Sequence, residues 1–129
     1  MTVNADFKVT NWDGKPFDEA VGVSKLTRAS VTKDYTGVIE GTSATEWLLA
    51  YEPDKSASFV GLERIKGTVE GRHGTLVLQH VGKFEGTAAT ADLTVVSGTD
   101  ELKGATGTGS FQADPAGSIS LTLIFGTND

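Results

Sequence analysis

The sequence is divided into short segments in which apolar and polar residues alternate, and most segments end at a turn-forming residue pair. Alternation of this kind sends successive side chains to opposite faces of a β-strand, so it excludes a helical fold for most of the chain. An antiparallel sheet is therefore expected, and eight strands suffice to close it into a β-barrel around one small ligand. The predicted strands are Ala5–Trp12, Val23–Lys33, Val38–Tyr51, Ser56–Glu70, Thr75–Phe84, Ala88–Ser97, Thr106–Ala113 and Ile119–Phe125, with one helical turn at Asp100–Lys103.

The size and charge of the chain restrict the classes of protein that it can belong to. Its 129 residues suit a single domain, residues 1–129, and without cysteine the fold contains no disulfide. A net charge of −6 with no basic stripe argues against nucleic-acid binding. No basic segment followed by an apolar core opens the chain, and no apolar run approaches the roughly 20 residues of a membrane helix. These features predict a cytoplasmic protein without a membrane partner.

Two ionisable residues lie in a stretch of apolar residues and glycines, and their spacing predicts that they meet. If Gly71-Arg72 forms a two-residue turn, Glu63 lies opposite His80 in the hairpin. A turn at Glu85-Gly86 then continues the same face into the next strand, with both side chains turned toward the barrel interior. The other side chains expected on this inner face are Phe59, Ile65, Val69, Leu76, Leu78, Phe84, Ala91 and Leu93.

The chemistry of this pair is open to two interpretations. A buried carboxylate beside an imidazole can form a proton-transfer pair, which would make Glu63 and His80 catalytic residues. The same pair can also be a hydrogen-bonded element of the core without chemistry. No metal site is predicted, because the chain's other histidine, His73, is seven positions from His80 and falls on the opposite face of a strand. No cofactor is predicted either, since the glycines of GATGTGSF do not lead from a strand into a helix.

Large side chains elsewhere are candidates for a ligand pocket. Trp47 and Tyr51 share one face of the third predicted strand, and Glu40 and Leu48 share the other. The sequence leaves open which face is internal, and the outward one is the expected contact of a homo-oligomer. The full set of expected ligand-binding residues is Phe59, Ile65, Leu78, Phe84, Trp12, Trp47, Tyr51 and Glu40.

Long stretches of the chain resemble a known family. The longest is SFVGLERIKGTVEGRHGTLVLQHVGKFEG (Ser58–Gly86), and the others are Ala29–Ser43, Leu49–Tyr51 and Ser97–Phe111. Together they resemble a family of small bacterial proteins of unknown function whose fold is similar to the allene oxide cyclase barrel. The sequence departs from that family at Asp100, where such proteins have glycine, and this position belongs to a turn.

The resemblance implies an eight-stranded barrel with a small central cavity and no established reaction. The better-known relatives of that barrel are plant cyclases and dirigent proteins, which act on their substrates mainly by confinement in an apolar interior. Their functional residues have no positional match in this sequence. We therefore expect a barrel that binds a small, largely apolar or amphipathic molecule, with isomerase or cyclase activity through Glu63 and His80 as one hypothesis. The alternative is a non-catalytic ligand-binding or structural barrel.

Overall fold

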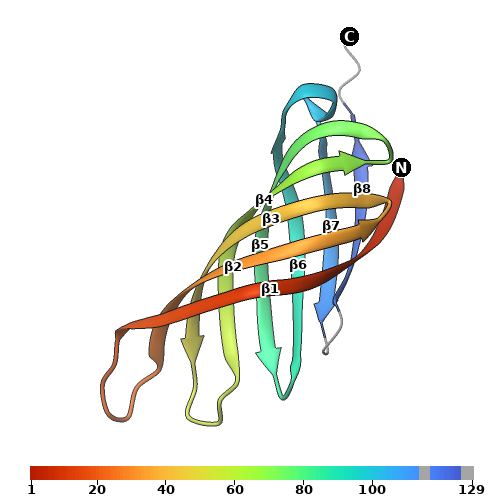
Figure 1. The fold of residues 1–129 in the computed structure, drawn as a ribbon. Helices are drawn as coiled ribbons and strands as arrows, with labels where there is room; N and C mark the ends of the chain where they lie inside the picture. The colour runs from red at the N-terminus through yellow and green to blue at the C-terminus, as the bar shows by residue number, and fades with distance from the viewer. Residues whose placement is uncertain (114–116, 126–129) are drawn as a thin grey trace.

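The computed structural model describes residues 1–113 and 117–125, which form a closed antiparallel barrel (Figure 1). Each strand pairs with the next along the chain, and β1 pairs with β8 to close the ring. In Figure 1, β1 to β3 run obliquely across the view, whereas β5 to β8 stand nearly upright. The elements are β1 (Thr2–Asp18), β2 (Lys25–Gly37), β3 (Ile39–Tyr51), β4 (Ala57–Val69), β5 (Arg72–Glu85), β6 (Ala88–Gly98), η1 (Asp100–Leu102), β7 (Thr106–Ala113) and β8 (Gly117–Ile124).

The predicted fold class is confirmed, and the alternation of polarity explains it. Along β3, buried and exposed residues alternate from Thr42 to Leu49, and the same period of two recurs on other strands, although on β1 only as far as Phe7. Closure turns one face of the sheet into a continuous core, because every strand contributes its inward residues to the same interior. None of the described residues forms a helix that is long and apolar enough to cross a membrane.

The first strand is longer than the sequence indicated. The first strand was predicted to end at Trp12, before the turn-forming pair Asp13-Gly14, but β1 continues through both residues and pairs Asp13 with Ser30 and Gly14 with Ala29. The prediction was wrong because the turn-forming pair lies beside β2, whose backbone groups it continues to bond. The register shifts between Val9 and Asn11 and again between Pro16 and Asp18, so extra residues of β1 are accommodated at two places.

The two central hairpins have the predicted faces but not the predicted turns. The β4–β5 turn is formed by Glu70 and Gly71, whose φ angles are 50° and 78°, and not by Gly71-Arg72. Two positive φ angles are typical of a type I′ turn, which matches the twist of the flanking strands. The first turn thus lies one residue earlier than expected, whereas the β5–β6 turn lies one residue later, at Gly86-Thr87.

Moving a two-residue turn by one position shifts the strand pairing by two residues. Glu63 is therefore opposite Leu78, and His80 is opposite Gly61, so the expected direct pairing of Glu63 with His80 was wrong. Because side chains alternate with a period of two, the shift leaves every residue on its predicted face. Glu63 and His80 both point inward, as expected, and are diagonal neighbours.

The predicted helical turn is present as η1, and its first residue explains the departure from the family pattern. Asp100 has a φ of 55°, a left-handed conformation that glycine adopts without cost and that aspartate tolerates. The Thr99 hydroxyl donates a hydrogen bond of 3.1 Å to Asp100 Oδ2 at this position. The turn then delivers Leu102 into the core, where it is 1% exposed.

Gly61 makes room for the side chain of Trp47 inside the barrel. A Cβ atom at this position would lie 2.5 Å from Trp47 Cδ1 and 2.2 Å from the Glu46 carbonyl oxygen. Both distances are well below normal contact, so only glycine allows the Trp47 ring to lie flat against β4. His80 is opposite Gly61 on β5, so the missing side chain also leaves the Trp47 indole within reach of the imidazole.

Candidate functional site

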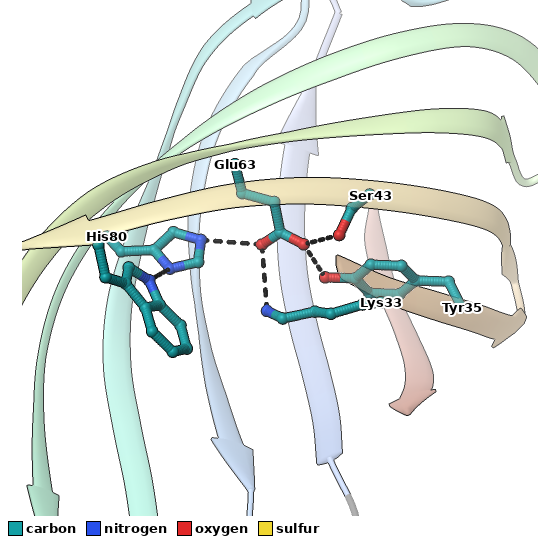
Figure 2. Close-up of polar contacts among 6 residues, drawn as sticks. Lys33, Tyr35, Ser43, Glu63 and His80 are labelled. Atoms are coloured by element: carbon teal, nitrogen blue, oxygen red, sulfur yellow. Dashed lines mark hydrogen bonds and ion pairs between the residues drawn. The ribbon is translucent and has the colours of Figure 1, made fainter. Parts of the chain in front are cut away.

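A buried carboxylate, that of Glu63, lies at the centre of the polar groups inside the barrel (Figure 2). Glu63 Oε1 is 2.8 Å from His80 Nε2 and 3.4 Å from Lys33 Nζ. Glu63 Oε2 accepts hydrogen bonds of 2.6 Å from the Tyr35 hydroxyl and 2.6 Å from the Ser43 hydroxyl. The residue is only 1% exposed, so these four groups replace the water that a carboxylate would otherwise bind.

The members of this network come from four consecutive strands. Lys33 and Tyr35 are two positions apart on β2, so both point inward, and Ser43 is opposite Lys33 on β3. Glu63 and His80 follow on β4 and β5. The network therefore links four of the eight strands through side chains, in addition to the backbone ladder between the strands.

A second hydrogen bond fixes the protonation of the His80 ring. The Trp47 indole Nε1–H donates to His80 Nδ1 at 2.9 Å, so this ring nitrogen acts as an acceptor and carries no proton. The proton of the neutral ring is then on Nε2, where it is donated to Glu63. Both nitrogens of His80 are thus engaged. We call Glu63, Lys33, Tyr35, Ser43, His80 and Trp47 the Glu63 network.

Glu63 is ionised in spite of its burial. Burial by itself raises the pKa of the Glu63 carboxyl, but the Lys33 ammonium and the hydrogen bonds from His80 and Ser43 outweigh it and lower the pKa to about 2. Burial raises the pKa of the Tyr35 hydroxyl well above its usual value, and the Glu63 charge raises it further. Tyr35 therefore keeps its proton and donates it to the carboxylate.

Lys33 is the positive partner of Glu63 and is surrounded by aromatic rings. Burial lowers the pKa of the Lys33 ammonium, and the Glu63 charge opposes this effect. Its Nζ atom lies 4.4 Å from the ring centre of Phe7, 4.8 Å from that of Phe111 and 5.6 Å from that of Trp47. Cation–π contacts with these faces favour the charged amine at a position where water is excluded.

A cavity of about 310 Å³ begins beside Lys33 and extends toward the β5–β6 hairpin. Its walls are mainly aromatic and aliphatic, and Lys33 is the charged residue among the described residues that line it. We call it the lumenal cavity. The lining residues are Phe7, Val9, Trp12, Lys33, Trp47, Leu49, Tyr51, Phe59, Phe84, Thr87, Ala89, Phe111 and Ala113.

A larger hollow of about 790 Å³ lies on the barrel's outer side and is lined mostly by exposed side chains of β1 and β5 to β8. It contains no member of the Glu63 network. Ligand sites are typically concave and largely apolar with a few well-placed polar groups, which describes the smaller lumenal cavity better. The lumenal cavity is therefore the candidate site.

The structure brings together most of the residues that the sequence singled out. Five of the expected ligand-binding residues line the lumenal cavity, namely Trp12, Trp47, Tyr51, Phe59 and Phe84. Ile65 and Leu78 point inward but are packed in the core away from the cavity lining. The prediction for Glu40 was wrong, since the odd-numbered face of β3 is the inner one and Glu40 is exposed on the outer wall.

Sequence reasoning missed Lys33, Tyr35 and Ser43, although a signal for them exists. On β2, Val31, Lys33 and Tyr35 alternate with polar residues, which places the lysine on the apolar face. A lysine there was read as the end of a strand, because charged residues are rarely buried without a partner. Its partner Glu63 is 30 positions away, so only the folded barrel reveals the pairing.

Metal binding finds no support in the described part of the chain, where no three His, Asp or Glu side chains gather in a way that could hold an ion. The Glu63 network itself contains one imidazole and one carboxylate, and their polar atoms are already engaged with Lys33, Trp47 and one another.

Comparisons with known proteins identify similar chains but no activity. A family model described as "Protein of unknown function (DUF3224)" matches residues 3–125. A crystal structure of a protein of unknown function from the same family, from Shewanella oneidensis MR-1, is 30% identical with a TM-score of 0.82. The alignment covers 97% of each chain. No curated protein matches this sequence. The likeness to the allene oxide cyclase barrel stays a prediction.

Proposed function

Because this chain belongs to the DUF3224 family, whose function is unknown, we propose from the site alone that it binds a small, largely apolar molecule in the lumenal cavity. The observation that carries the proposal is the aromatic cavity of about 310 Å³ beside the Glu63 network. This volume is at the lower end of the range of about 300–1,000 Å³ that ligand sites occupy. A barrel needs no such space for stability, since close packing of the interior is the stable arrangement.

We favour binding over catalysis as the role of this site. Each oxygen of Glu63 already accepts two contacts, and each nitrogen of His80 has a partner. A general base needs a free lone pair within reach of the substrate, and neither residue lines the cavity. A carboxyl with a pKa of about 2 is also a weak base near neutral pH. The role we assign to the Glu63 network is therefore to position Lys33 and Trp47, its two members that line the cavity.

The proposal is tested with ethylbenzene, which has the apolar character that the cavity walls favour. We expect saturable shifts of the Trp12 and Trp47 indole N–H signals in nuclear magnetic resonance spectra, with a Kd on the order of 0.1 mM. Filling the cavity by Ala89→Phe should weaken binding at least tenfold, because Ala89 lines it. Ala44→Phe, on the outer face of β3, is the matched control and should change nothing.

Native mass spectrometry of the purified protein gives an independent measurement, because a ligand that survives purification appears as an added mass. Absence of any saturable shift up to the solubility limit of ethylbenzene contradicts the proposal. So does equal binding by wild type and Ala89→Phe, which would place the ligand outside the lumenal cavity.

A further inference from the structure

Lys33 and Trp47 are the members of the Glu63 network that line the lumenal cavity, and Lys33 is the charged one. A protonated lysine has three N–H donors, and the contact of 3.4 Å with Glu63 uses one of them. The rings of Phe7, Phe111 and Trp47 face the remainder of the ammonium, and a ring face is a weaker acceptor than an oxygen. Lys33 therefore has hydrogen-bonding capacity that the described residues do not use fully.

We propose that the ligand carries an uncharged carbonyl oxygen that accepts a hydrogen bond from Lys33 Nζ. This inference rests on the proposed function and names the chemical class of the ligand. The Lys33 side chain is 1% exposed, so such a bond forms away from bulk water, where it is stronger than in solution. Lys33 also lines the lumenal cavity, so its side chain lies beside a ligand bound there.

The charges of the site decide between a neutral and an anionic ligand. Lys33 and Glu63 together are neutral, and the hydrogen bond from Trp47 leaves His80 uncharged. A ligand carboxylate would place a second negative charge near Glu63 in a dry interior. The free energy of burying and repelling that charge exceeds the stabilisation that a single ammonium can give to two carboxylates. A carbonyl oxygen satisfies Lys33 without adding charge.

The cavity volume limits the size of the ligand. At roughly 30 Å³ for each water molecule in the liquid, about 310 Å³ corresponds to about ten water-sized groups. A single aromatic ring with a short acyl substituent has this size, and flat rings fit walls built from Trp47, Phe59 and Phe111. An aryl ketone is accordingly the simplest representative of the class.

Three probes that share one benzene ring test the inference: ethylbenzene, acetophenone and benzoate. Their Kd values are measured from the indole N–H shifts of Trp12 and Trp47, in wild type and in Lys33→Met. We expect acetophenone to bind wild type at least as tightly as ethylbenzene, although it is far more soluble in water. In Lys33→Met, the affinity for acetophenone should fall at least about tenfold more than the affinity for ethylbenzene, since a hydrogen bond to a charged group is lost. Benzoate should bind wild type more weakly than acetophenone.

Each result has a distinct meaning. If ethylbenzene binds but the ratio of the two Kd values is the same in both proteins, the carbonyl inference is overturned and the proposed function stands. If benzoate binds most tightly, the ligand is an anion and the inference is overturned. If no probe binds, both proposals fall. Lys8→Met, on the outer wall of β1, is the matched control, and Lys33→Met/Glu63→Gln replaces the single variant if that variant does not fold.

The outer wall of the barrel carries a row of exposed apolar side chains. Leu48, Val60 and Val81 are directly opposite one another across β3, β4 and β5, and each is about half exposed. The same line continues to Arg28 on β2 and to Asp92 on β6. We call these five residues the outer row. An apolar centre thus has Asp92 at one end and, at the other, Arg28, whose Nε also donates to Glu46 Oε1 at 3.0 Å.

From this arrangement we infer that the outer row binds the outer row of a second copy of the chain. A two-fold axis that runs parallel to β4 through Val60 sets each Arg28 against Asp92 of the other copy. Isologous contacts require such self-complementary surfaces, and the opposite charges at the two ends meet that requirement. Leu62, which is 55% exposed on β4 beside Val60, extends the apolar centre of the contact. Leu48, one of the two oligomer contacts that the sequence left open, is thus on the outward face.

Light scattering and sedimentation at about 100 µM protein test this inference, with a dimer expected at twice 13.5 kDa. Val60→Lys should produce the monomer, because two like charges would meet at the axis. Arg28→Asp and Asp92→Arg should each weaken the dimer by roughly tenfold, and the double variant should restore it. Asp34→Arg, an exposed charge reversal elsewhere on β2, is the control. A wild-type monomer, a dimer that survives Val60→Lys, or a double variant without restoration overturns the inference.

Discussion

Glu63→Leu is expected to lower the free energy of unfolding by about 4 kcal/mol, because it leaves the Lys33 ammonium buried without its partner. The hydroxyls of Tyr35 and Ser43 and the His80 ring lose their acceptor as well. A loss of this size is a large part of the roughly 5–15 kcal/mol that stabilises a typical domain. Urea unfolding followed by tryptophan fluorescence measures it.

Two further variants make this result specific to the Glu63 network. Glu40→Leu, an exposed glutamate on the outer face of β3, should stay within about 0.5 kcal/mol of wild type. Lys33→Met/Glu63→Leu should cost clearly less than the sum of its single variants, since the double change removes both charges together. If Glu63→Leu costs no more than Glu40→Leu, the network does not stabilise the barrel.

Acid is expected to destabilise the barrel over a defined range of pH. The pKa of the Glu63 carboxyl is about 2 in the folded protein, against a reference value of 4.5. A lowered pKa means that the contribution of Glu63 is fully present above pH 4.5 and is lost as the pH falls toward 2. A difference of this size corresponds to about 3 kcal/mol. Urea unfolding at a series of pH values between 6 and 2 measures it.

The contribution of Glu63 is separated from that of other carboxylates by substitution. Hydrogen bonds also lower the pKa values of Glu46 and Asp54, which are largely exposed and add a common background. Glu63→Gln should remove most of the pH dependence below 4.5, because the amide does not titrate. Glu40→Gln should retain it. Equal slopes for the two variants would show that the acid sensitivity arises elsewhere.

The face of each inward residue was predictable because it depends only on the alternation of side chains. Phe59, Glu63, Ile65, Leu78 and His80 were all assigned correctly to the interior from their spacing. This assignment survived an error in both hairpin turns, because each error moved the register by an even number of residues. Strand number and closure followed from the same pattern.

The register itself was decided by backbone conformation that the sequence does not state. The φ angle of 50° at Glu70 selects a turn one position earlier than the glycine suggested. The length of β1 likewise depends on its pairing with β2, which overrides the turn tendency of Asp13-Gly14. Local preferences of a fraction of a kcal/mol give way to a complete ladder of backbone hydrogen bonds.

By itself, the sequence determined the barrel and the inner face that Glu63 and His80 share, since these follow from a period of two, whereas the meeting of the two side chains depends on the register. Only the tertiary structure decided what that meeting means, because Lys33, Trp47 and His80 are brought together from three different strands. Contacts between residues 30 or more positions apart depend on strand stagger and on closure of the ring, neither of which leaves a local pattern. For that reason the lysine at the cavity floor became visible only in the folded chain.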